Sequence, residues 1–182
     1  MFVLLVCTVA LTTVAAQDDC VIGNGKYLQD KKEVNVSRLS GEWFTVYANP
    51  KNVTEFLTCW TSDVSMNANG TFNLYYSYYN ETTNRRQVTS AIMEHQMNAF
   101  HHYHPNDPQF NAEYYILGTD YDQFVIYGGC PPDWPALRKV TWVEFRTKEP
   151  SPSAKEAAEN ALQEQGLDLS EYTDFCPDKS KY

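Results

Sequence analysis

The chain has 182 residues, of which 14 are Lys or Arg and 23 are Asp or Glu, so its formal net charge is −9. This length accommodates one domain with a substantial core. The acidic balance argues against a nucleic-acid-binding protein, whose surface would be basic. It also provides no polybasic segment to attract an anionic membrane.

The first 16 residues, MFVLLVCTVALTTVAA, form an apolar run that ends in small residues. This pattern predicts a secretory signal peptide over residues 1–16 and a mature domain over residues 17–182. The run is short for a membrane span, and no other stretch is suited to one, so we expect no membrane insertion. The sequence therefore predicts a secreted, extracellular protein.

The cysteines support an oxidising compartment. Cys7 lies in the predicted signal peptide, which leaves Cys20, Cys59, Cys130 and Cys176 in the mature chain. An even number of cysteines in a secreted protein predicts two disulfides, for which three connectivities exist. Their wide spacing argues against a zinc site, which usually uses close cysteine pairs.

Four Asn-X-Ser/Thr sequons indicate glycosylation of a secreted chain. They also mark positions that we expect to be exposed. The acceptor residues are Asn35, Asn52, Asn69 and Asn80.

Between residues 41 and 146, short runs rich in Tyr, Phe, Val and Thr alternate with segments rich in turn residues, such as NANG at 67–70 and TDYD at 119–122. Such runs favour β-strands. We expect eight of them, at roughly 43–50, 58–66, 71–79, 86–94, 98–104, 112–118, 123–129 and 138–146. Short strands at regular spacing predict an all-β sandwich or barrel.

The segment SPSAKEAAENALQEQG at 151–166 predicts one amphipathic helix of about three turns. Ser153 and Glu156 fit a capping box, and Gly166 is a natural stop. The strands VTWVEFR and FVIY carry large apolar groups on both faces, which predicts that both faces are covered. We expect the core on one face and the helix on the other.

Three short motifs lie at the ends of predicted strands. Gly41 and Trp43 open the first strand as Gly-X-Trp, Thr119-Asp120-Tyr121 lies at a hairpin, and Arg146 ends the last strand. In this order and spacing, the three motifs resemble those of the lipocalin family. The resemblance covers essentially the whole mature chain. The four cysteines are similar to those of insect lipocalins, and the segments DDC and GTDYDQFVIYGGC are most similar to the cockroach lipocalins that include allergens.

The resemblance implies an all-β fold: an eight-stranded up-and-down antiparallel barrel with one C-terminal α-helix packed on the outside. It implies disulfides between Cys20 and Cys130 and between Cys59 and Cys176. It also implies structural roles for the motif residues, with Trp43 inside the closed end of the barrel and Arg146 across it.

A barrel of this type holds one small ligand. Alternation along the strands, phased by the family motifs, predicts which residues face the interior. Of these, we expect the following to contact a ligand: Tyr47, Trp60, Val64, Met66, Leu74, Tyr76, Tyr78, Val88, Ile92, Tyr114, Ile116, Val125, Tyr127, Trp142 and Glu144. The lining is mostly apolar and aromatic, which suits a hydrophobic molecule with one polar group, although several of these side chains would also simply fill a small barrel.

Two polar features leave alternatives open. Glu144 points inward on this phase, where it would pair with an amine ligand or, as we favour, with Arg146 or phenol groups. The cluster HHYHP contains His101, His102 and His104, but neighbouring residues of a strand point to opposite faces, so we expect an exposed cluster at the rim and no metal or cofactor.

The sequence contains no nucleophile elbow, HExxH motif or phosphate-binding loop, and we expect no enzyme. It predicts a carrier for a small hydrophobic ligand, such as a pheromone or other volatile or a fatty acid. A biogenic amine or a bilin are further ligands compatible with the resemblance. The alternative is a nutrient, epicuticular or salivary protein whose role does not depend on its cavity.

Overall fold

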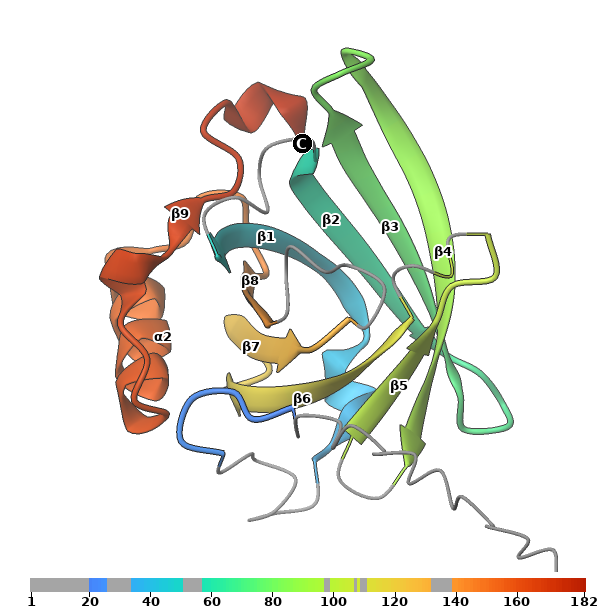
Figure 1. Cartoon of the computed structure of the whole chain (residues 1–182), viewed down its shortest axis with the longest axis horizontal. Helices are drawn as coiled ribbons and strands as arrows, with labels where there is room; N and C mark the ends of the chain where they lie inside the picture. Colours follow the sequence, from blue (N-terminus) through green and yellow to red (C-terminus); the bar gives the residue numbers. More distant parts are fainter. Residues whose placement is uncertain are drawn as a thin grey trace, which may run out of the picture.

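The computed structural model describes residues 20–25, 34–50, 57–96, 99–106, 108, 111–131 and 139–182 (Figure 1). The predicted signal peptide and the sequon at Asn52 lie outside the described residues, so both stay predictions.

The eight predicted strands are present, with ends that differ by a few residues from the expected ones. They are β1 (Gly41–Asn49), β2 (Leu57–Met66), β3 (Phe72–Asn80), β4 (Arg85–Gln96), β5 (Ala99–Tyr103), β6 (Ala112–Thr119), β7 (Phe124–Gly129) and β8 (Val140–Phe145). A short strand that the sequence did not predict, β9 (Thr173–Asp174), pairs with β1.

Each strand pairs in antiparallel fashion with the next along the chain, from β2 to β8. The sheet closes because β1 pairs with both β8 and β2. Closure satisfies the edges that an open sheet would expose. The expected up-and-down barrel with one helix outside it is confirmed.

The helix α2 (Pro152–Glu164) lies against the outside of the barrel (Figure 1). It contacts β6 and β7, and Ala154, Ala158 and Leu162 are its buried residues. They join an outer apolar cluster with Ile126 and Val143, residues of the strands that are apolar on both faces. This explains why β7 and β8 lack a polar face.

The helix begins earlier than the expected capping box. Ser151 is the N-cap, and its side chain accepts a hydrogen bond from the backbone N–H of Ala154, while Pro152 occupies the first turn. Ser153 therefore lies inside the helix, because the fixed φ of proline suits the first helical position. Gly166 follows the helix with a φ of +71°, as its stop role requires.

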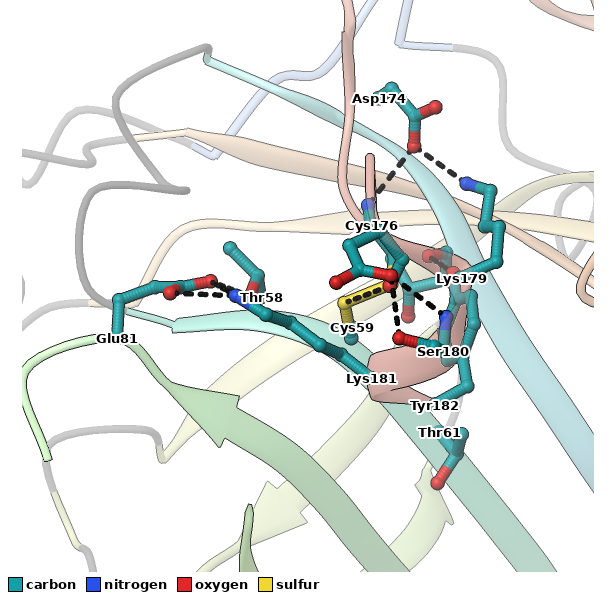
Figure 2. The surroundings of a disulfide bond; sticks show 12 residues. Thr58, Cys59, Thr61, Glu81, Asp174, Cys176, Lys179, Ser180, Lys181 and Tyr182 are labelled. Atoms are coloured by element: carbon teal, nitrogen blue, oxygen red, sulfur yellow. Dashed lines mark hydrogen bonds and ion pairs between the residues drawn. A yellow bond between two sulfur atoms is a disulfide. The ribbon is translucent and has the colours of Figure 1, made fainter. Parts of the chain in front are cut away.

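The C-terminal segment contacts β1, β2 and β3. It contains two 3-10 helices, η4 (Leu169–Glu171) and η5 (Lys179–Lys181). Figure 2 shows η5 beside the disulfide that joins Cys59 of β2 to Cys176. Lys181 forms an ion pair with Glu81 at 3.0 Å and lies over the ring of Tyr79, so the segment is held at more than one point.

No helix in the described part of the chain combines the length and the apolar character needed to cross a membrane.

Candidate functional site

One end of the barrel is sealed by Trp43 and Arg146. Trp43 is 1% exposed, and its indole N–H donates to the carbonyl of Leu39 at 2.7 Å. The guanidinium of Arg146 lies 3.5 Å from the centre of the Trp43 ring, which is a cation–π contact. Arg146 also donates to the backbone carbonyls of Arg38, Glu42 and Tyr121. A single side chain thus ties three separate segments together at this end.

Gly41 has a φ of +98°, in a region that favours glycine. A Cβ at this position would come within 3.1 Å of the Arg146 guanidinium. The first motif therefore needs glycine for its backbone conformation and for the close approach of the last motif.

The hairpin that carries Thr119, Asp120 and Tyr121 lies at the same end. Asp120 accepts hydrogen bonds from the backbone N–H groups of Asp122, Gln123 and Phe124. Partial burial raises the pKa of Asp120, but these bonds outweigh burial and lower it overall. The carboxylate therefore holds the turn in its ionised form.

Above the sealed end the barrel encloses a cavity of about 50 Å³. Its wall consists of Leu39, Trp43, Ser62, Val64, Leu74, Tyr76, Met93, Phe100, His102, Tyr114, Ile116, Val125, Tyr127 and Glu144. We call this the inner cavity. A space of this size holds a few water molecules, so a larger guest requires side chains to move.

A second space of about 20 Å³ lies next to it, lined by Trp60, Tyr76, His102, His104, Tyr114, Tyr127 and Trp142. We call this the outer cavity. Tyr76, His102, Tyr114 and Tyr127 line both spaces and so form the partition between them. Trp60 stacks on Trp142 with ring centres 5.5 Å apart. A guest longer than a few heavy atoms would join the two cavities by displacing partition side chains.

Glu144 is the buried acid of the inner cavity, with 3% of the residue exposed. Its Oε1 accepts hydrogen bonds from Thr45 at 2.8 Å and Tyr127 at 2.9 Å, and its Oε2 accepts one from Ser62 at 3.1 Å. Burial raises the pKa of Glu144, and the three hydroxyl donors oppose this shift without cancelling it. The sequence suggested an amine ligand, Arg146 or a phenol as the partner of Glu144, and the phenol of Tyr127 forms a hydrogen bond with it.

The expectation of a rim-exposed histidine cluster is wrong for two of the three histidines. His102 and His104 are 8% and 4% exposed, and both line the cavities. His102 Nδ1 lies 3.2 Å from the hydroxyl of Tyr76, and this polar partner makes an inward histidine acceptable. Burial lowers the pKa of His102 to about 3, so the ring is neutral at physiological pH. His101 lies on the other face, next to Glu113.

Most of the predicted ligand-contacting residues lie on the inner face of the barrel. Those that line a cavity are Trp60, Val64, Leu74, Tyr76, Tyr114, Ile116, Val125, Tyr127, Trp142 and Glu144. Tyr78 packs against the inner core and stacks on Trp60.

Tyr47 was placed wrongly inside. The pairing of β1 with β8 shifts between Thr45, opposite Glu144, and Tyr47, opposite Val143. This bulge inserts one residue and reverses the side-chain alternation beyond it. Tyr47 therefore joins the outer cluster and contacts the ring of Phe145.

The phase predicted for β4 was also wrong. Val88 and Ile92 are 72% and 39% exposed, whereas Ala91 and Met93 are buried. Residues directly opposite each other in an antiparallel pair share a face, and Leu74 lies opposite Ala91. The larger aliphatic residues thus point outward on this strand, against the usual hydrophobic pattern.

Met66 has the predicted phase but lies beyond the barrel. It is 56% exposed, because β1 begins at Gly41, opposite Val64, and provides no neighbour for the end of β2. The end of β2 extends beyond the closed part of the barrel, so the side chain of Met66 is exposed to solvent.

Several wall residues were missed from the sequence: Leu39, Met93, Phe100, His102 and His104. Phe100 and His102 of β5 and His104, which directly follows β5, are two residues apart in sequence, and this spacing was the available signal, since a buried phenylalanine fixes the face of its strand. The prediction of a rim cluster considered only that His101 and His102 point to opposite faces and that the segment runs into the turn at Pro105, which does not separate His102 from His104.

The two disulfides of the structure join Cys20 to Cys130 and Cys59 to Cys176, the same pairs that the resemblance implies. Of the sequons, Asn35 and Asn69 are exposed and Asn80 is half-buried. Within the described ranges, no group of three or more His, Cys, Asp or Glu residues is arranged to hold a metal ion.

Comparisons with known proteins agree with this geometry. The chain is 29% identical over 150 residues to the Lazarillo protein of Schistocerca americana, an alignment that covers 78% of this chain and 69% of that protein. A crystal structure of the cockroach major allergen Per a 4 matches with a TM-score of 0.70 and 18% identity, covering 87% of this chain and 94% of that one. The tryptamine complex of the amine binding protein of Rhodnius prolixus matches with a TM-score of 0.64 and 18% identity, covering 81% and 85%.

At such identities the structural matches show the fold. The family assignment comes from the sequence itself: residues 40–177 match the model of the lipocalin / cytosolic fatty-acid binding protein family, and the chain belongs to that family.

Proposed function

We propose that this protein binds one compact hydrophobic molecule inside the barrel and carries it in an extracellular fluid. The observation that carries the proposal is the inner cavity, whose wall is apolar and aromatic apart from a few polar side chains. Such a combination orients a small ligand by its polar group and holds its body by apolar contact. The two disulfides fit an oxidising compartment, in line with the predicted signal peptide.

The dimensions of the interior favour a small guest. The inner and outer cavities are separated by the partition residues Tyr76, His102, Tyr114 and Tyr127. A long chain would have to displace all of them, whereas a single ring with a short tail requires only local rotation. The similar amine binding protein, described in complex with tryptamine, supports a ligand of this size for this chain.

A matched pair of substitutions tests the proposal. Val125 lines the inner cavity, and Val88 is 72% exposed on the outer face, so Val125→Phe fills the cavity while Val88→Phe adds the same ring outside it. Calorimetric titrations with 2-phenylethylamine, 2-phenylethanol and propylbenzene should give one site per chain for at least one compound. Val125→Phe should weaken that binding by more than about tenfold because the added ring takes the ligand's space, while Val88→Phe leaves it unchanged.

If none of the compounds binds, or if Val125→Phe binds as well as the unaltered protein, the cavity is not the ligand site. That outcome would favour the alternative of a nutrient, epicuticular or salivary protein, which predicts no saturable binding that depends on the cavity. Native mass spectrometry of protein from its natural source would then be expected to show an empty barrel.

A further inference from the structure

The inner cavity contains a buried acid whose charge the protein does not neutralise. Glu144 receives hydrogen bonds from Thr45, Ser62 and Tyr127, all of which are uncharged hydroxyl groups. The ion pairs found in the described part of the chain join other side chains, and none involves Glu144. A buried carboxylate is stabilised by a cation or becomes protonated.

Arg146 is two residues away in sequence but serves a different contact. Its guanidinium lies over Trp43 and donates to the backbone carbonyls of Arg38, Glu42 and Tyr121. Its charge lowers the pKa of Glu144 less than burial raises it. The Arg146 guanidinium therefore seals the barrel end, and none of the ion pairs in the described residues joins it to Glu144.

The acid has room for one more donor. A carboxylate offers about four acceptor positions, of which Oε1 uses two and Oε2 uses one. Aromatic side chains form part of the wall of the cavity that Glu144 lines, and they include Tyr76, Phe100 and Tyr114. Aromatic faces attract cations, most strongly where water is excluded.

We propose that the ligand is a compact amine with an aromatic or apolar body, and that its ammonium group supplies the missing positive charge by pairing with Glu144. This inference rests on the proposed function and names the class of molecule that the cavity takes. An anionic ligand would meet the charge of Glu144, and an alcohol would leave that charge without a counter-ion.

The three compounds named above separate these possibilities because they share a ring and tail length and differ in the terminal group. We expect 2-phenylethylamine to bind at least about tenfold more tightly than 2-phenylethanol or propylbenzene, as a charge-assisted hydrogen bond contributes more than a neutral one. Glu144→Gln should reduce the affinity for the amine by about 10- to 100-fold and change that for the alcohol by less than about threefold. Glu42→Gln, the same change at an exposed site on β1, is the control.

The unaltered protein provides a second test that does not depend on how the variant folds. Burial raises the pKa of Glu144 in the free protein, and an ammonium partner would lower it. Below the raised pKa, amine binding must therefore release a proton, and the affinity falls as the pH drops. Above it the affinity is constant while the amine stays protonated. Titrations in two buffers of different ionisation enthalpy measure the released proton directly.

Other titratable groups face Glu144, adjoin its cavity or feel its charge. They are Tyr76 of β3, His102 of β5, Tyr114 of β6, Tyr127 of β7, His104 and Arg146, which directly follow β5 and β8, and Tyr182 in the C-terminal segment. All of them remain in Glu144→Gln, so any pH dependence that this variant keeps belongs to them. The part of the pH dependence of amine affinity that is lost in Glu144→Gln belongs to Glu144.

The outcomes separate this inference from the function on which it rests. If the alcohol binds as tightly as the amine, Glu144→Gln leaves amine affinity unchanged, and no proton is released at low pH, the amine inference is wrong while the cavity remains a ligand site. If no compound binds, the proposed function itself fails.

Discussion

Replacement of Arg146 by alanine is expected to destabilise the folded protein by about 3 kcal/mol, as measured by denaturant unfolding followed by tryptophan fluorescence. The guanidinium lies 3.5 Å from the Trp43 ring and is the donor for carbonyls of Arg38, Glu42 and Tyr121. Alanine would leave these carbonyls without their hydrogen-bond donor and would remove the cation–π contact with the indole, and both changes lower the free energy of unfolding.

Arg146→Lys separates charge from geometry. Lysine keeps the positive charge but has no planar fork, so it cannot stack on the ring and donate to several carbonyls at once. We expect it to recover less than half of the loss. Arg38→Ala is the comparison. The Arg38 guanidinium also lies over a ring, that of Tyr121, but its ion pair with Asp122 is exposed, so we expect a loss of less than about 1 kcal/mol. A loss below about 1 kcal/mol for Arg146→Ala would show that the seal is not a major source of stability.

The sequence predicted the strands and the barrel well because their signals are local. Short aromatic and β-branched runs separated by turn residues identify strands wherever they occur, and the motifs at Trp43 and Arg146 set the inner face of β1 and β8. The residues that line the cavity were predicted correctly on strands whose large apolar residues face inward, such as β7 with Val125.

The errors arise where tertiary pairing overrides the pattern. The bulge that turns Tyr47 outward lies between Thr45 and Tyr47, and no glycine or proline marks it in the sequence. On β4 the pairing of Leu74 with Ala91 puts Val88 on the surface, against the preference for burying valine. On β5 the contact of His102 with Tyr76 makes a polar residue acceptable inside.

One of these exceptions, the inward His102, lies at the candidate site. If only apolar side chains pointed inward, the interior would be a packed core with no polar group to orient a ligand. Glu144 and His102 are polar groups that point inward, and they mark the part of the barrel that is more than a packed core. Because hydrophobic alternation does not predict the partners of an inward polar group, the sequence alone left the role of Glu144 open.

Loss of the disulfide between Cys59 and Cys176 is expected to have the largest effect on stability. The bond closes a segment of 117 residues, for which the chain-entropy model gives about 5 kcal/mol. Both cysteines are fully buried, and Phe175 beside Cys176 packs into the inner core. Figure 2 shows that the bond lies where the C-terminal segment meets β2.

The double variant Cys59→Ala with Cys176→Ala should therefore lose about 4 to 5 kcal/mol of unfolding free energy, measured in a guanidinium titration. A loss of this size is a large part of the total stability of most small domains. Cys20→Ala with Cys130→Ala is the natural comparison, since its loop of 110 residues predicts nearly the same entropic loss. Its cysteines are only half-buried, so any excess loss at Cys59 and Cys176 measures the packing of the C-terminal segment. Equal and small losses, below about 1.5 kcal/mol for both pairs, would show that the barrel is stabilised by its own closure and that neither bond is needed to hold it.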